Sequence, residues 1–437
     1  MRLSGTLLVA LGCLSASGAA LGGEVSDPVD VAPNAEGTQM QMWPRAAWAA
    51  GSGSWLVVWR EGYINQEATD VWAGRVSADG KALDPTGICI TKAPDRQERA
   101  VVASDGRGWL VVWEDFRNGK DYDVYAARVS PEGEVLDPDG FLVAGGEHNQ
   151  CYPAVAFAGG NYVVVWQAFV GDYPDGTKDK NGRVSGYRLY GTTVSPKGKV
   201  TTPGGTVLTP ANMWHALRPA AITAGDSRHV LVGFKAHHPG GGQQSTTIAT
   251  LWVEGASGKT ELRYQEPPAG DNRKADSLDG QPLAVAWGKD GGLVLSHRYE
   301  HLDEVSVWRL DESGARVLPE ISSAKGHQVG FYPMYSVASD GQQYLVTRDR
   351  VVKQKPLPML GVQARFLPAD WKGGKDAPLD KEFFLVAGDG KRSCLMGHAA
   401  AGCEGAFLVT YTEARAVDNV RVLARVVKSH QESPPGK

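Results

Sequence analysis

The chain of 437 residues carries a formal net charge of −4 at pH 7, from 45 basic and 49 acidic side chains. This balance leaves no basic excess that would favour nucleic acid or an anionic membrane surface as a partner, so nucleic acid is not expected. The 54 glycines and 25 prolines indicate many turns between short elements, which disfavours a helix-rich fold.

Residues 1–23 have the pattern of an export signal, with Arg2, an apolar run at 7–11 and small residues before Glu24. Cleavage near residues 20–23 would release a free protein, whereas the sequence ALGC ending at Cys13 resembles a bacterial lipobox and would place a lipid anchor there. No later run approaches the roughly 20 apolar residues that span a bilayer, so no transmembrane helix is expected. We expect an exported protein, in the periplasm, at the outer membrane surface or outside the cell.

A strand hairpin is the recurring unit of the chain. WLVVWRE at 55–61 returns as WLVVWED at 109–115 and as YVVVWQA at 162–168, each after a small-residue strand and a Gly-containing turn. Such turns tolerate the positive φ of a tight hairpin, and the unbroken apolar run indicates a strand buried on both faces. The four later copies are AAITAGDSRHVLVGF, AVAWGKDGGLVLSH, YSVASDGQQYLVTR and HAAAGCEGAFLVTY.

Each hairpin is followed by a third strand with alternating polar residues, such as DVYAARV at 123–129, then by a turn and a more variable fourth strand. Four strands repeated at intervals of about 50 to 65 residues are typical of a β-propeller blade. The sequence therefore predicts an all-β fold, a single seven-bladed β-propeller over 24–430, with six or eight blades as alternatives. A polar tail, 431–437, follows.

The last copy lacks a fourth strand, while DPVDVAP at 27–33 resembles the end of a blade. An N-terminal strand that completes the last blade would close the ring and remove an unpaired edge. We therefore predict closure by this strand.

The first two copies continue with related segments, EDFRNGKDYD at 114–123 and YAARVSPEGEVLDPDG at 125–140 being the clearest. In these features the chain resembles secreted bacterial β-propeller repeat proteins. The match is close in the first two copies, recognisable in the third, and limited to strand pattern in the other four. The resemblance implies an envelope or extracellular protein with a structural motif, and it transfers no catalytic residue.

Candidate binding groups gather in the loops of the third and fourth copies, where the copies differ most. Loops that follow the second strand, and loops between blades, open on one face of a propeller, so these groups are expected to meet at the channel mouth. A sugar could stack on an aromatic ring there while carboxylates accept its hydroxyl hydrogen bonds. Solvated loops without function are the structural alternative. The candidates are Asp172, Tyr173, Asp175, Asp179, Trp214, His215, His237 and His238.

No cofactor is expected, with calcium as the alternative. Thr177, Asp179, Asn181 and Gly182 match part of a calcium loop, but the first ligand and the bidentate Glu are missing. A transition metal would use the histidines, although adjacent His237 and His238 would point to opposite faces of a strand.

Four cysteines follow the export signal, and Cys394 and Cys403 flank a predicted hairpin and are candidates for a disulfide. No catalytic motif or local pair of carboxylates stands out. The Asp and Arg residues of the repeat, Asp115 with Arg117 and Asp123 with Arg128, are interpreted as ties between loops and strands. We therefore predict a non-enzymatic binding or scaffold module with a protein or polysaccharide partner at the cell envelope. The alternative is a carbohydrate-active or metal-assisted hydrolase with its site at the channel mouth.

Overall fold

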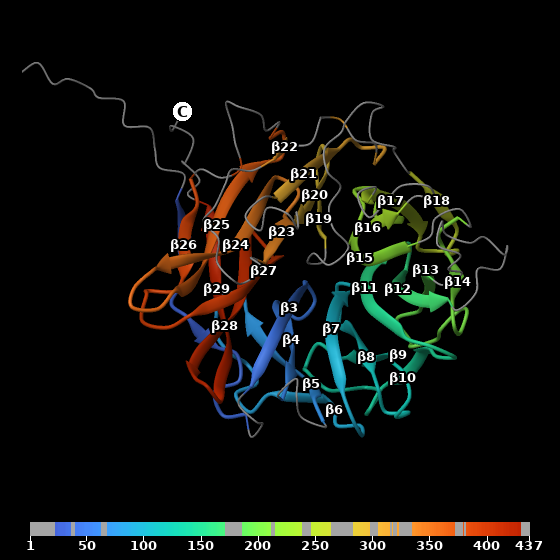
Figure 1. The fold of residues 1–437 in the computed structure, drawn as a ribbon, viewed down its shortest axis with the longest axis horizontal. Coiled ribbons are helices and arrows are strands. Elements are labelled where there is room, and N and C mark those ends of the chain that lie inside the picture. Colours follow the sequence, from blue (N-terminus) through green and yellow to red (C-terminus); the bar gives the residue numbers. More distant parts are fainter. Residues whose placement is uncertain are drawn as a thin grey trace, which may run out of the picture.

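The computed structural model is a ring of antiparallel sheets, and Figure 1 shows it along its shortest axis. The sheets form a seven-bladed β-propeller, as the sequence predicts, and the described residues include no helix. None of them forms a helix with the length and apolar character needed to cross a membrane. The structure describes residues 22–35, 40–62, 68–170, 186–210, 215–237, 246–263, 283–297, 305–314, 317, 321–322, 334–371, 379 and 382–429.

The blades are numbered here in chain order, each listed from its innermost strand outwards. Blade 1 consists of β3 (Gln41–Ala49), β4 (Ser54–Glu61), β5 (Asp70–Ser77) and β6 (Ile88–Thr91). Blade 2 consists of β7 (Gln97–Ser104), β8 (Trp109–Asp115), β9 (Asp123–Val129) and β10 (Phe141–Ala144). Blade 3 consists of β11 (Gln150–Ala158), β12 (Asn161–Val170), β13 (Gly186–Val194) and β14 (Thr206–Val207). Blade 4 consists of β15 (His215–Thr223), β16 (His229–His237), β17 (Thr246–Glu254) and β18 (Thr260–Leu262).

Blade 5 consists of β19 (Ala284–Gly288), β20 (Gly291–His297), β21 (Val305–Leu310) and β22 (Ile321–Ser322). Blade 6 consists of β23 (Tyr335–Ser339), β24 (Gln343–Lys353), β25 (Met359–Pro368) and β26 (Phe384–Ala387). Blade 7 consists of β27 (Cys394–Ala401), β28 (Ala406–Ala416) and β29 (Asn419–Ser429), followed by β1 (Gly23–Val25) and β2 (Val29–Asp30).

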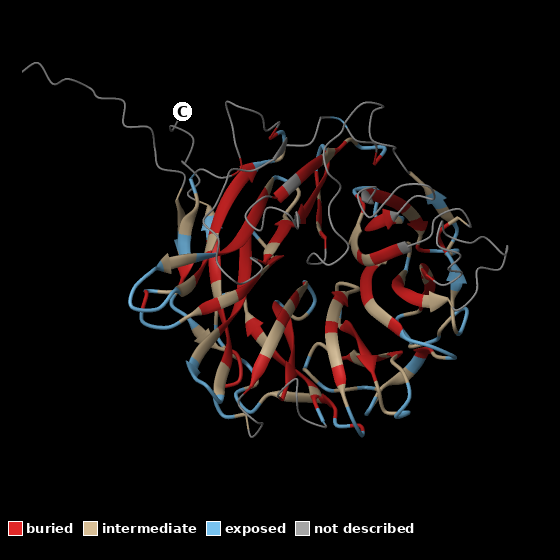
Figure 2. Cartoon of the chain, viewed as in Figure 1, coloured by how far each residue is buried: buried red, intermediate tan, exposed pale blue. Residues whose placement is uncertain are grey.

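The second strand of a blade supplies the core on both of its faces. All eight residues of β4 and all seven of β8 are buried, which confirms the expected burial. Leu56 and Val58 pack with Trp109 and Val111 of the next blade, while the opposite face of β4 packs against blade 7. Figure 2 shows this burial along the middle strands of the ring. Alternate side chains of the second strand contact the blade before it and the blade after it. Repeating the sequence of this strand therefore repeats the same interface between blades.

In the first two copies, an Arg of the third strand pairs with an Asp nine residues later and so joins the strand to the following turn. Arg128 donates from Nε and Nη2 to the two carboxylate oxygens of Asp137 at 2.8 Å each, and Arg75 pairs with Asp84 in the same way. The expected tie between Asp123 and Arg128 is therefore wrong, because Asp123 instead accepts from Asn118 at 3.0 Å. Asp137 also accepts the backbone N–H of Arg128 at 3.0 Å, so one carboxylate binds both the backbone and the side chain of Arg128.

The N-terminal strands complete blade 7 and close the ring. β1 pairs antiparallel with β29, Glu24 opposite Lys428, and β2 pairs with the same strand, Val29 opposite Ala424. Arg425 donates to the carbonyl oxygen of Ser26 at 3.0 Å. The predicted closure is confirmed, and the edge of β29 is covered.

The predicted disulfide between Cys394 and Cys403 is absent, and both are free thiols, as are Cys89 and Cys151. Cys394 begins β27, whereas Cys403 lies in the turn beyond the far end of that strand. Their separation is on the order of 20 Å or more, since a strand rises about 3.3 Å per residue and a disulfide needs Cα atoms within about 7 Å. The prediction was wrong because it placed the two cysteines on opposite sides of a hairpin. In the structure, Cys394 begins β27 and Cys403 follows the end of the same strand.

Candidate functional site

The predicted ligand-binding residues lie mostly outside the described part of the chain. This holds for Asp172, Tyr173, Asp175, Asp179, Trp214 and His238. The backbone of His215 begins β15 and that of His237 ends β16, and the two are cross-strand Cα partners. Their side chains are outside the described part as well, so the structure brings together only the backbones of these two residues.

The same end of the ring carries a feature that the sequence interpretation missed. The innermost strands of five blades contain a β-bulge near their first residues, and the bulged residue has positive φ. The five are Trp43 (61°), Arg99 (50°), Tyr152 (52°), Arg218 (53°) and Met396 (61°). We call this end of the ring, where the second strands finish and the inter-blade connections arrive, the bulge end. Non-glycine residues with positive φ are uncommon, and a bulge changes the direction in which side chains point. The recurrence of such bulges in five blades indicates that they are a regular feature of the repeat.

A side chain on the preceding blade holds the backbone of a bulge. In three blades the acceptor comes from the same position of the second strand, one residue beyond the last core position. Glu114 Oε1 accepts from the Tyr152 amide at 2.5 Å, and Gln167 Oε1 accepts from the Arg218 amide at 2.8 Å. Asp349 accepts from the amides of Met396 and Gly397, at 2.8 and 3.1 Å. These bonds join neighbouring blades and satisfy N–H groups that the bulge removes from the ladder.

Burial perturbs the two carboxyl groups in this set. Glu114 is 3% exposed and Asp349 is 7% exposed. Burial raises the pKa of Glu114 to about 7, opposed by the positive charge of Arg99 and the amide of Tyr152. Burial likewise raises the pKa of Asp349 to about 7, opposed by the three backbone hydrogen bonds around it. Loss of hydration therefore outweighs the bonds that favour the charged forms.

Arginine and aromatic side chains cluster at the bulge end of blades 2 to 4. The guanidinium carbon of Arg99 lies 4.2 Å from the centre of the Tyr152 ring, and that of Arg218 lies 5.2 Å from the same ring. Arg96 lies over Phe116 at 5.0 Å and over Tyr122 at 5.8 Å. Such contacts orient a guanidinium plane without using its hydrogen-bond donors. We call Arg96, Arg99, Tyr152 and Arg218 the arginine cluster.

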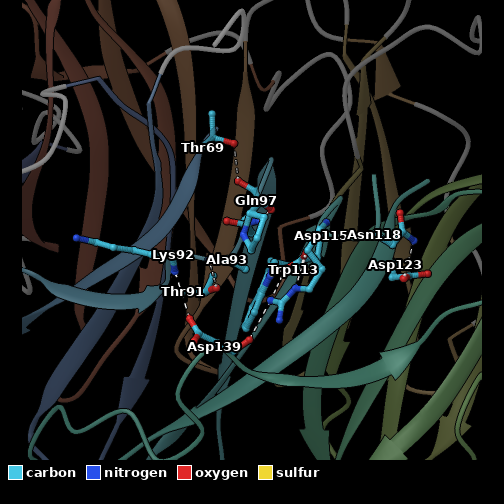
Figure 3. A network of polar contacts seen from close by, with 12 residues as sticks. Thr69, Thr91, Lys92, Ala93, Gln97, Trp113, Asp115, Asn118, Asp123 and Asp139 are labelled. Atoms are coloured by element: carbon cyan, nitrogen blue, oxygen red, sulfur yellow. Dashed lines mark hydrogen bonds and ion pairs between the residues drawn. The ribbon is translucent and has the colours of Figure 1, made fainter. Parts of the chain in front are cut away.

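The loop beside this cluster is fixed by the polar network in Figure 3. Asp115 accepts from Trp113 Nε1 at 2.8 Å and from Arg117 Nη2 at 2.6 Å, which confirms the predicted tie to Arg117. Asn118 bonds Asp123 at 3.0 Å, so both ends of the loop are held. The Gln150 amide donates to the carbonyl of Tyr122 at 2.7 Å, which attaches the loop to blade 3. The cluster thus stands on a rigid support.

Within the residues that can be described, no group of three or more His, Cys, Asp or Glu side chains could hold a metal ion. The calcium and transition-metal alternatives involve residues beyond that part of the chain. The arginine cluster is cationic, which suits an acidic ligand better than a metal.

Comparisons with known proteins give the fold and no activity. No family model matches the sequence, and no curated protein matches it either. A crystal structure of a protein of unknown function from Dyadobacter fermentans is similar, with 13% identity, coverage of 94% of this chain and 100% of that chain, and a TM-score of 0.52.

Two solved enzyme structures are more distant. Trypanosoma rangeli sialidase in complex with 2,3-difluorosialic acid has 10% identity, coverage of 92% of this chain and 59% of that chain, and a TM-score of 0.47. Native Bacillus subtilis arabinanase has 10% identity, coverage of 64% and 94%, and a TM-score of 0.33. At these values the Dyadobacter structure supports the propeller fold, and the two enzymes support no assignment of activity.

Proposed function

We propose that this chain is an exported β-propeller binding module, of the secreted bacterial repeat type, that recognises an acidic polysaccharide at the bulge end of blades 2 to 4. The observation that carries the proposal is the placement of two guanidinium groups, Arg99 and Arg218, against one tyrosine ring. Guanidinium groups held in a fixed plane can bind carboxylates with two parallel hydrogen bonds.

The charge balance around the cluster supports an anionic ligand. Arg60 is only 2% exposed, and burial lowers its pKa; the positive charge of Arg99 lowers it further, while the larger effect of Glu98 opposes this. Glu98 and Glu114 are the acidic neighbours that act on Arg99, with Glu114 the stronger. Because the pKa of Glu114 is about 7, that carboxyl is only partly ionised at neutral pH and compensates less positive charge than a free carboxylate would.

The hydrolase alternative requires two carboxyl groups that face one substrate. Glu114 and Asp349 have the raised pKa that a general acid needs, but they belong to different blades and each accepts an amide hydrogen bond from the next blade. Their equivalent positions favour a structural role in joining blades. We therefore favour binding over hydrolysis.

The test compares polygalacturonate with its fully methyl-esterified form by calorimetry, because the two share one sugar backbone and the ester replaces each carboxylate charge with a neutral methyl ester. We expect the acidic form to bind and the esterified form to bind at least tenfold more weakly, with affinity falling as salt is raised. Arg218→Gln and Tyr152→Leu should each weaken the acidic form about tenfold or more. Arg107→Gln, at an exposed turn, is the matched control and should bind as the wild type does.

Equal binding of both polysaccharide forms would contradict the proposal, as would retention of full affinity in both cluster variants. Capture of an acidic protein in place of either polysaccharide would assign the surface to a protein partner instead. Release of reducing ends during the titration would restore the hydrolase alternative.

A further inference from the structure

Two basic residues lie on the inner strands of blades 7 and 1, deeper along the strands than the bulges, and the charge of one acts on the other. Arg45 lies on β3 opposite Val58, and His398 lies on β27 opposite Thr410, each the first paired residue after its bulge. The inner strands β27 and β3 lie beside one another around the axis of the ring (Figure 1). The two side chains therefore occupy equivalent positions in adjacent blades.

Arg45 is a partly buried cation. Burial and, to a smaller extent, the positive charge of Arg99 together lower its pKa to about 10. One guanidinium nitrogen, Nη1, donates to the carbonyl oxygen of Pro44 at 2.8 Å. Among the described residues, none of the ion pairs between side chains includes Arg45. A partly buried cation without a counter-charge among the described residues can pair with an anion from solution.

His398 adds an unsatisfied hydrogen-bonding group at the same place. Its Nδ1 is buried and has no hydrogen-bond partner within the described part of the chain. Burial lowers the pKa of His398 well below its usual value, and Arg45 lowers it further, so the imidazole is neutral. A neutral imidazole can still donate one N–H, and a buried polar nitrogen without a hydrogen-bond partner destabilises the folded state.

We propose that Arg45 and His398 bind one small oxyanion, a carboxylate or a phosphate, between the inner strands of blades 7 and 1. The guanidinium supplies charge and a donor fork, and the imidazole N–H supplies a further donor, which together satisfy the oxygen atoms of one anion. The site lies in different blades from Tyr152 and Arg218 and does not depend on the polysaccharide proposed above. It goes beyond that function, and the two can fail separately.

The experiment titrates sodium acetate and, separately, inorganic phosphate into the full chain at constant low ionic strength, with binding followed by calorimetry. We expect one site per chain for at least one of the two anions, and the preferred anion distinguishes a carboxylate from a phosphate source. Arg45→Met and His398→Leu should each weaken binding at least tenfold, whereas Arg107→Gln should leave it unchanged. The proposal is overturned if neither anion binds with one-to-one stoichiometry, or if both site variants bind as the wild type does.

Thermal unfolding provides a second readout that separates binding from a structural role. In anion-poor buffer, Arg45→Met should melt at or above the wild-type temperature, because it removes a partly buried cation that has no counter-charge among the described residues. Adding the bound anion should raise the melting temperature of the wild type and of Arg107→Gln, but not that of Arg45→Met. If Arg45→Met does not fold, His398→Leu tests the same site alone. Equal anion-dependent shifts in the wild type and the variants would refute the site.

Discussion

Replacing Glu114 by Gln tests whether the buried carboxyl at the bulge end joins blades by hydrogen bonding. Gln167 occupies the equivalent position in blade 3 and accepts the Arg218 amide at 2.8 Å, so a Gln at position 114 can keep the bond to the Tyr152 amide. The substitution removes the ionisation and leaves the acceptor in place. Any pH dependence of the difference in free energy of unfolding between the two proteins then comes from the charge of Glu114.

The raised pKa sets the size and the direction of the effect. The pKa rises from 4.5 in the unfolded chain to about 7 in the folded chain, so the folded state holds this proton more tightly. Its stabilising contribution is complete below pH 4.5 and is lost as the pH rises to 7. The shift corresponds to about 3 kcal/mol at most, since one pKa unit is about 1.4 kcal/mol. This amount already includes the opposing attraction of Arg99.

Urea unfolding followed by tryptophan fluorescence, at pH 4.5 and at pH 8, measures the effect. The free energy of unfolding of Glu114→Gln, minus that of the wild type, should increase by up to about 3 kcal/mol between the two pH values. Asp349 titrates over a similar range but is present in both proteins and cancels. Glu132→Gln, at an exposed turn, is the matched control. A difference that stays constant with pH would refute the assigned environment of Glu114.

Two further changes test the packing of the repeat and the closure of the ring. Gly140 and Gly106 both have positive φ, 75° and 87°, but a Cβ at Gly140 would collide with the Trp113 ring while one at Gly106 meets nothing within 4 Å. Gly140→Ala should therefore lower the free energy of unfolding by about 1–3 kcal/mol more than Gly106→Ala, and equal losses in urea unfolding would contradict the packing. Removal of residues 22–33 exposes the edge of β29, and should cause association in light scattering and faster proteolysis of blade 7; a monomeric, equally resistant protein would show that closure is dispensable.

The repeat was predictable from the sequence because hairpin turns and two-faced burial leave strong local patterns. WLVVW and LDPxG each encode contacts within one blade or with its neighbour, so their recurrence was enough to predict the blades. The N-terminal strand could be assigned to blade 7 because 27–33 repeats the end of a blade. Its partner, β29, could be inferred only by counting strands around a closed ring.

The candidate site was not predictable in the same way. The signal for three bulges was present, because Trp43, Tyr152 and Arg218 each precede a proline, but a residue before proline also fits an ordinary extended strand. The partners of the bulges come from another blade, as Glu114 does for Tyr152. The pairing of Arg128 with Asp137 instead of Asp123 was missed because Asp123 is nearer to Arg128 in the sequence. The turn after the third strand nevertheless brings Asp137 into contact with Arg128 in space.

The pairing of β1 with β29 also orders the events of folding. Ser26 and Arg425 meet although 399 positions separate them, whereas blades 1 to 6 each use strands that follow one another along the chain. Blades 1 to 6 can form as the chain emerges, but the first strand has no partner until the last one exists. Contacts this distant close slowly. A chain interrupted before β29 would therefore end as an open arc with an unpaired strand, and could not become a smaller finished ring.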